Sequence, residues 1–160
     1  MRTLLAQSFT LDEVTGLRQS VAERAAGCGL SGARLEDYIL AVHESVINAV
    51  EHGGGHGRFT LWTGDRMLRS ETIDEGSGIP DEYVDEHRRP PDIAYTGRGI
   101  YLIRTLCDGA SFHTGPTGTT VRLMMWLPRL AHVALQRAPT RRIRVAATSG
   151  GKQQHHGFRT

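Results

Sequence analysis

The stretch HESVINAVEHGGG, residues 43–55, decides how this chain is interpreted. Glu44 and Asn48 are four residues apart, so on a helix their side chains lie one turn apart on the same face and can reach one ligand. Two glycine motifs follow, D-x-G-x-G from Asp74 and G-R-G from Gly97, and the second directly precedes an apolar run at helical spacing. One carboxylate, one amide and two glycine turns in this order predict a Mg²⁺·ATP pocket without a Walker-type phosphate loop.

Apolar periodicity and turn residues predict the elements around these motifs. We expect a strand over residues 4–9, helices over 11–27 and 31–52, strands over 58–63 and 67–73, a helix over 99–106, and strands over 110–113 and 119–127. Strands and helices that do not alternate strictly predict an α+β two-layer sandwich, with a mostly antiparallel or mixed sheet and helices on one face.

Three details of this pattern can be checked. Thr10 and Glu13 have capping-box spacing at the start of the first helix. The buried side of that helix is expected to carry Leu11, Val14, Leu17 and Val21, and the buried side of the second Leu35, Tyr38, Ile39, Val42, Val46 and Val50. The strand over 67–73 is unusually polar, which indicates one solvated face.

Charge divides the 160 residues into two parts. From Arg129 onward there are seven basic residues and no acidic one, which leaves 12 basic against 17 acidic residues in positions 1–128. We expect a folded ATP-binding domain over 1–128 and a basic, disordered tail over 129–160, because the tail is rich in Gly, Ser, Thr and Gln. The acidic body argues against direct nucleic-acid binding by the core; binding of nucleic acid by the tail alone is a weaker alternative.

The N-terminal sequence MRTLLAQSFTLDEV lacks the basic and apolar blocks of a signal peptide, and charged residues interrupt every long apolar run. Neither a membrane span nor a membrane partner is therefore expected. These features predict a cytoplasmic protein.

Four motifs stand in the order and with the spacing of the ATP-binding boxes of the Bergerat-type (GHKL, histidine-kinase-like) ATPases. They are E-x-x-x-N-A from Glu44, D-x-G-x-G from Asp74, G-x-G from Gly97 and G-T-T-V from Gly118. Each alone is common in glycine-rich chains, whereas all four in order are specific. The resemblance covers about residues 4–128. Gyrase, histidine kinases and anti-sigma-factor serine/threonine kinases share this superfamily, and the short chain and the form of residues 43–54 resemble the anti-sigma kinases.

The resemblance and the residue chemistry assign roles on the first helical motif. Asn48 is the expected metal ligand, since its amide oxygen suits a Mg²⁺ ion that otherwise keeps waters and phosphates. Glu44 is the expected catalytic residue, a general base that accepts a proton from a hydroxyl group or a water. His52 and His56 also suggest a metal pair, but no third ligand has a useful spacing, so we interpret them as surface histidines.

The remaining motifs supply the expected nucleotide contacts. Asp74 is expected to accept a hydrogen bond from the adenine amino group, which favours adenine over guanine, and Gly76 and Gly78 allow the main chain to approach the base. Thr119 is carried over as a supporting hydroxyl beside Asp74, with Thr120 as the alternative. The other glycine motif, with Gly97, Arg98 and Gly99, precedes a helix whose free amides can hold phosphate oxygens. For Arg98 two roles are open: its positive charge helps to hold the phosphates, or its side chain faces a partner protein. A lid is expected over residues 80–95.

The resemblance implies an ATP-dependent anti-sigma regulatory kinase. Such a protein binds a sigma factor and, with Mg²⁺·ATP, phosphorylates a STAS-like anti-sigma antagonist on Ser or Thr. The alternative is a catalytically inactive, nucleotide-gated binding protein, and the presence of Glu44 favours the enzyme. Whether the chain forms a homodimer, as relatives do, is left open.

Overall fold

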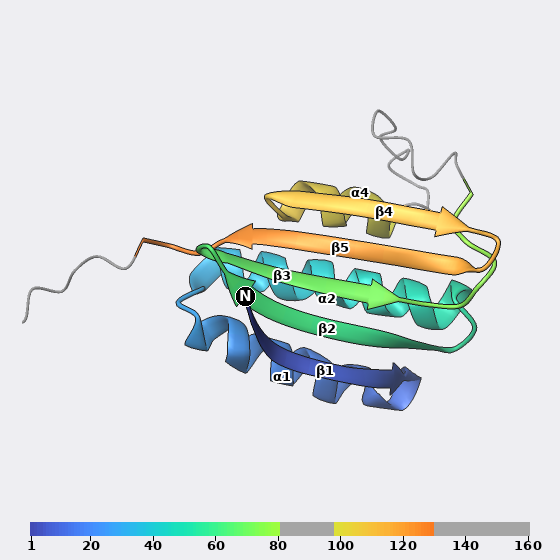
Figure 1. The fold of residues 1–160 in the computed structure, drawn as a ribbon, viewed down its shortest axis with the longest axis horizontal. Coiled ribbons are helices and arrows are strands. Elements are labelled where there is room, and N and C mark those ends of the chain that lie inside the picture. The colour runs from blue at the N-terminus through green and yellow to red at the C-terminus, as the bar shows by residue number, and fades with distance from the viewer. Residues whose placement is uncertain (81–97, 130–160) are drawn as a thin grey trace, which may run out of the picture. The chain divides into compact units, whose positions relative to one another are not determined.

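The computed structural model describes residues 1–80 and 98–129, which form a five-stranded sheet with helices packed on one face (Figure 1). The elements are β1 (Arg2–Thr10), the 3₁₀ helix η1 (Leu11–Glu13), α1 (Val14–Gly27), α2 (Gly32–His52), β2 (His56–Gly64), β3 (Met67–Ile73), α4 (Arg98–Leu106), β4 (Gly109–Gly115) and β5 (Gly118–Trp126). Among the described helices, none is long and apolar enough to cross a lipid bilayer.

The strand order is β1-β2-β3-β5-β4, and all four neighbouring pairs are antiparallel. The predicted α+β sandwich is thus confirmed, with a sheet that is antiparallel throughout. Because β5 pairs with β3, Ile73 lies opposite Thr120. This register brings Asp74, just beyond β3, to the first residues of β5, so two motifs 45 residues apart in sequence meet at one end of the sheet.

The core lies between the sheet and the helices. Alternate residues of the central strands point toward the helices, and Phe59, Leu61 and Leu68 are fully buried. Tyr38 and Val42 of α2 are also fully buried and belong to the same core cluster. Burying one such side chain stabilises the fold by about 1.5–3 kcal/mol, so this stripe fixes both the position and the rotation of α2. The adjacent face of α2 then carries the polar motif.

The predicted first helix is correct in position but wrong in its first turn. Glu13 Oε2 accepts a hydrogen bond from Thr10 N at 2.8 Å, as the capping box requires. Leu11 nevertheless has 61% of its surface exposed, because residues 11–13 form a 3₁₀ helix before α1 begins. The tighter helix rotates this side chain away from the buried stripe of Val14, Leu17 and Val21.

The buried stripe of α2 differs from the predicted one. Leu35, Ile39 and Val50 are only partly buried, whereas the buried residues are Tyr38, Ala41, Val42, Ser45, Val46 and Ala49. Small residues at three of these six positions let the helix approach the strands closely. A search for large apolar residues overlooks this kind of contact.

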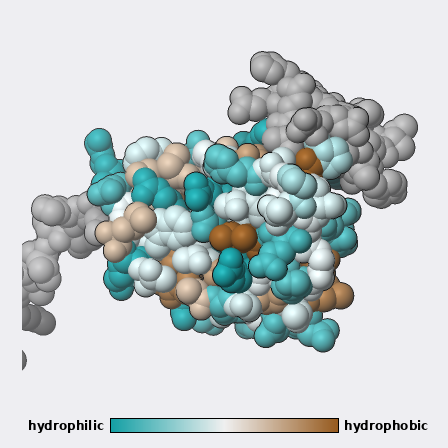
Figure 2. Space-filling model, turned by 45° about the vertical axis from the view of Figure 1, so that its right-hand side comes forward, coloured by the Kyte–Doolittle hydropathy of each residue, from teal (hydrophilic) through white to brown (hydrophobic). Residues whose placement is uncertain are grey.

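The polar strand β3 has one buried face, with Leu68, Ser70 and Thr72, and one partly exposed face. Glu71 lies on the open side and forms an ion pair with Arg122 of β5 at 2.6 Å. On the helix side, the buried Thr72 hydroxyl lies 2.9 Å from that of Ser45. Figure 2, in a view turned by 45°, shows a surface that is mainly hydrophilic with small separate hydrophobic areas.

At the other end of the sheet, Asp108 connects α2, α4 and β5. Its carboxylate accepts both terminal nitrogens of Arg34 and, at 2.7 Å, the main-chain N–H of Trp126, while Arg34 also donates to Trp126 O at 3.2 Å. The hydrogen bond from Arg34 holds the pKa of Asp108 below its usual value, and that from Trp126 acts in the same direction.

We predict that Asp108→Asn lowers the free energy of unfolding near neutral pH by about 0.5–1 kcal/mol, because the half-exposed pair is screened by solvent. Since the pKa of Asp108 is depressed in the folded state, its stabilisation is present above the usual Asp pKa of about 3.9 and is lost as the pH falls through the folded value. Urea unfolding of both proteins should therefore show a difference that shrinks toward low pH. A difference independent of pH would contradict this account.

Candidate functional site

A cavity of about 1010 Å³ lies between the C-terminal half of α2, the first turn of α4 and the adjoining ends of β3 and β5. Its volume is at the upper end of the range of about 300–1,000 Å³ for small-ligand sites. Seven of the predicted site residues line it: Glu44, Asn48, Asp74, Gly78, Arg98, Gly99 and Thr119. Gly76 does not line the cavity but packs against His52 and Gly53 at the end of α2. Gly97 lies outside the described residues.

Glu44 and Asn48 face the N-terminal turn of α4. Gly99 packs against both: a Cβ at this position would lie 2.8 Å from Glu44 Oε2 and 3.2 Å from Asn48 Nδ2. Only a glycine can occupy this position while the two side chains remain where they are. Two motifs 51 residues apart in sequence are therefore in contact, and the carboxylate and the amide lie beside the start of α4.

Asp74 is oriented by the main chain. Its Oδ1 accepts hydrogen bonds from Gly76 N at 3.0 Å and from Thr119 N at 3.1 Å, and Asp74 N donates to Thr119 O at 2.9 Å. Within the described residues, Oδ2 takes part in no hydrogen bond or ion pair. The carboxylate thus has one oxygen fixed by the fold and a second oxygen available to a donor in the cavity.

Three glycines make room for Asp74. A Cβ at Gly53, just after α2, would overlap Asp74 Cβ, and one at Gly118 would overlap Asp74 O. A Cβ at Gly76 would lie 2.5 Å from His52 O and from Gly53 Cα. Three segments therefore pack against one another around Asp74 with no side chain between their main chains, which is why glycines occupy these positions.

Beyond Asp74, the D-x-G-x-G turn packs against the end of β4. Gly78 has a positive φ of 84°, which glycine adopts without strain, and its Cβ position would lie 2.8 Å from Thr114 Oγ1. Thr114 Oγ1 accepts a hydrogen bond from Ile79 N at 2.5 Å and lies 3.3 Å from Thr119 Oγ1. A chain of hydroxyl and amide groups therefore fixes the D-x-G-x-G turn to the β4–β5 hairpin.

The first turn of α4, where the phosphate groups are expected, offers main-chain amides and the guanidinium of Arg98. The first amides of a helix have no intrahelical acceptor, and they carry partial positive charge. Arg98 is exposed, lines the cavity, and forms no hydrogen bond or ion pair with any described residue. Glu44, Glu51 and Asp74 line the same cavity, so among its described lining residues carboxylates outnumber the guanidinium of Arg98. A polyphosphate would therefore need a divalent cation beside it, and Asn48 offers that cation a neutral oxygen.

Several lining residues were not predicted. Ser45, whose hydroxyl bonds Val42 O and Thr72, supports the floor, and the apolar lining includes Ile47, Ile79, Ile100, Leu102 and Val121. The positions of these residues in the sequence do not indicate that they line a cavity. The pairing of Thr114 with Thr119, by contrast, follows from the register of the β4–β5 hairpin. Of the two threonines considered, Thr119 is buried and lines the cavity, whereas Thr120 does not line it. The lid expected over 80–95 lies outside the described residues beyond Pro80.

With this geometry established, comparison with known proteins is informative. Residues 8–125 match the family model of the histidine kinase-like ATPase domain. The chain belongs to this family. The resemblance inferred from the four motifs is thereby confirmed. Membership of an ATPase family implies that the cavity of about 1010 Å³ is a nucleotide site.

One curated relative and one solved structure are similar to this chain. Over 100 residues the chain is 31% identical to an anti-sigma F factor of Clostridium acetobutylicum, which covers 57% of this chain and 68% of that protein. The crystal structure of the RsbU and RsbW domains of Rv1364c from Mycobacterium tuberculosis is similar in fold, with a TM-score of 0.56 and 22% identity over 77% of this chain. Our chain spans only 32% of that longer protein.

We predict that Gly99→Ala impairs the site without unfolding the protein. The added methyl displaces the ends of Glu44 and Asn48, whereas alanine in a helix is favoured over glycine by up to about 1 kcal/mol. Nucleotide affinity measured by calorimetry should fall by about tenfold or more, with no loss of thermal stability. Gly16→Ala in α1, where no atom lies within 4 Å of the new methyl, is the matched control and should bind normally. Equal affinity in both variants would contradict the packing argument.

Proposed function

We propose that the protein is an anti-sigma regulatory kinase: it binds a sigma factor and, with Mg²⁺·ATP, phosphorylates a STAS-like antagonist protein on Ser or Thr. The observation that carries the proposal is the contact of Gly99 with both Glu44 and Asn48, which supports a proton-accepting role for Glu44 and a metal-ligand role for Asn48 beside the start of α4. The relationship to an anti-sigma F factor supports the choice of partners. These partners act in the cytoplasm, so the proposed location is cytoplasmic.

Adenine recognition depends on Asp74. Its remaining oxygen accepts the N–H of the adenine amino group, while guanine, which presents a carbonyl oxygen at the equivalent position, would face the carboxylate with like partial charge. The ring lies against apolar lining residues such as Ile79 and Val121. The hydroxyl of Thr119, next to that of Thr114, supports the same end of the pocket. Asp74, Gly76 and Gly78 thus form the base site.

The phosphate groups belong at the opposite side of the cavity, over α4. The amides at the start of α4 and the guanidinium of Arg98 offer donors, and Asn48 Oδ1 ligates Mg²⁺. We place Gly97 in this segment from its motif alone. ATP supplies the phosphoryl group, and a site of this kind works mainly by positioning and by stabilising charge.

Glu44 performs the proton transfer. The hydroxyl oxygen of the antagonist forms a bond to the γ-phosphorus as the bond to the bridging oxygen of ADP breaks, and Glu44 accepts the hydroxyl proton. Products are the phosphorylated antagonist and ADP. In the alternative function, a nucleotide-gated binding protein, no group needs to accept a proton, and a carboxylate one turn from Asn48 would have no role.

We predict that Glu44→Gln abolishes phosphoryl transfer and leaves ATP affinity within about twofold, because a general base typically contributes about 10²–10⁴ in rate. Labelling with [γ-³²P]ATP would be measured on STAS-domain proteins from the source organism, each mixed with the full chain. Glu51→Gln is the matched control, since Glu51 lines the same cavity with a largely exposed side chain. Unchanged labelling in the Glu44 variant refutes the base assignment; no labelling by the wild type, with ATP bound, favours the alternative.

A further inference from the structure

A second cavity, of about 440 Å³, lies at the other end of α2 from the nucleotide site. Its lining comes from the α1–α2 connection, the first turn of α2, the β2–β3 turn and the end of β5, and includes Leu30, Ser31, Arg34, Arg66, Trp126 and Arg129. A helix of 21 residues is about 30 Å long, and the nucleotide cavity begins only at Glu44. Among the described residues, the two cavities share none.

The second cavity has an excess of positive charge. Among the described residues that line it are three guanidinium groups and one carboxylate, that of Asp108. The carboxylate of Asp108 already forms an ion pair with Arg34. Arg66 and Arg129 are exposed and form no side-chain hydrogen bond or ion pair with the described residues. Two cations are therefore available to an incoming ligand.

The cavity is built on a fixed frame. Arg34 and Asp108 together bond both main-chain polar groups of Trp126, whose side chain remains 49% exposed. Arg66 lies in a tight turn with a positive φ of 59°, and its carbonyl oxygen accepts Leu127 N at 2.9 Å. The backbone that carries each free cation thus adjoins the end of β5. A half-exposed Trp and two Arg side chains that have no partner among the described residues line this cavity, and Trp and Arg are residue types that dominate protein-binding sites.

We propose that this cavity is a docking site for an acidic segment of a partner protein. Carboxylates of the segment pair with Arg66 and Arg129, for which a planar guanidinium offers two parallel hydrogen bonds, and an aliphatic side chain between them packs on Trp126. The proposal stands independently of the kinase function, because it uses no residue of the nucleotide cavity.

Charge selects this occupant over two others. The chain's own residues 130–160 contain six basic residues and no acidic one, so they would be repelled. Nucleic acid would have to approach a body whose first 128 residues hold 17 acidic against 12 basic groups, and a small hollow suits one or two side chains better than a duplex. A short acidic segment places its charge only at the two free cations.

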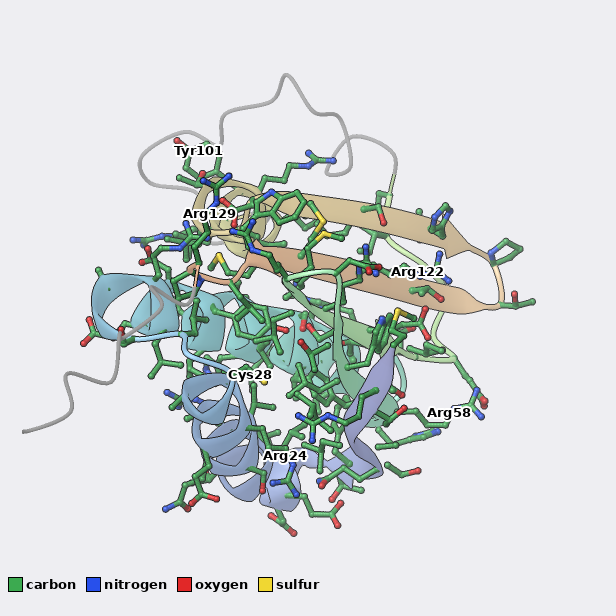
Figure 3. All side chains as sticks on the ribbon, turned by 60° about the vertical axis from the view of Figure 1, so that its left-hand side comes forward. Arg24, Cys28, Arg58, Tyr101, Arg122 and Arg129 are labelled. Atoms are coloured by element: carbon green, nitrogen blue, oxygen red, sulfur yellow. The ribbon has the colours of Figure 1, made fainter. Side chains whose placement is uncertain are left out.

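The test is fluorescence anisotropy of a labelled peptide EELEE with the full chain at low salt. Arg66→Ala/Arg129→Ala should weaken binding by about tenfold or more, since two charge-assisted contacts are lost. Arg24→Ala/Arg58→Ala removes the same charge from exposed positions away from Arg129 (Figure 3) and should change affinity by no more than about twofold. Both pairs leave the described ion pairs intact, so thermal unfolding should be unchanged.

Two further measurements separate the outcomes. Unlabelled peptide should alter the tryptophan fluorescence of the wild type but not of Trp126→Phe, although Trp62 remains. A labelled dT oligonucleotide should show no difference between the two double variants, because any binding arises from the basic C-terminal residues. Equal weakening of EELEE by both double variants, or no binding by the wild type, overturns the proposal. Loss of oligonucleotide binding only in the Arg66/Arg129 variant would reassign the cavity to nucleic acid.

Discussion

The fixed carboxylate of Asp74 is the constraint on which the site depends. Its Oδ1 is held by two main-chain amides, one from its own turn and one from Thr119 on β5. Close main-chain contacts at Gly53 and Gly118 leave it no room to move sideways. A carboxylate that shared both oxygens with the fold could not select a ligand, whereas one held by a single oxygen presents the other in a defined direction. The specificity for the base that we propose would therefore be built into the backbone.

Helix α2 connects the surroundings of Asp74 to the rest of the molecule. Its buried stripe includes Tyr38 and Val42, and the Ser45–Thr72 hydrogen bond joins the helix to β3 just before Asp74. Burial fixes its rotation, so Glu44 and the rest of the polar motif must face α4. The same helix begins beside the basic cavity at Arg34 and ends beside the nucleotide cavity. A partner bound at one end and a nucleotide bound at the other would thus contact a single rigid element.

Much of this organisation is readable in the sequence. The capping box at Thr10, the apolar residues of α2 at a spacing of about 3.6 residues and the alternation of β5 predicted these elements, because each pattern depends on neighbours along the chain. Glu44 and Asp74 are candidate site residues because the order of the motifs is specific even where single motifs are not. Local patterns place such residues on elements, and the antiparallel register then brings them together.

Other features could not be read in advance, because they depend on residues distant in sequence. Leu11 has the right spacing for burial, yet a 3₁₀ turn exposes it. Gly53 directly follows the predicted helix over 31–52, and the sequence gives no sign of its close contact with Asp74, 21 residues further on. The basic cavity was missed for the same reason, since Arg66 and Arg129 lie in different segments and meet only where β5 ends.

The central claim is that Asp74 selects adenine through its one remaining oxygen, and calorimetric titration of ATP, ADP and GTP with Mg²⁺ into wild type and Asp74→Asn tests it most directly. In the variant, the asparagine oxygen keeps the two main-chain donors and turns its NH₂ group toward the adenine amino group, so donor faces donor. We predict that the wild type binds ATP and ADP at least about 100-fold more tightly than GTP, and that Asp74→Asn loses this preference. Equal affinity of the wild type for ATP and GTP, or unchanged selectivity in Asp74→Asn, would contradict the account.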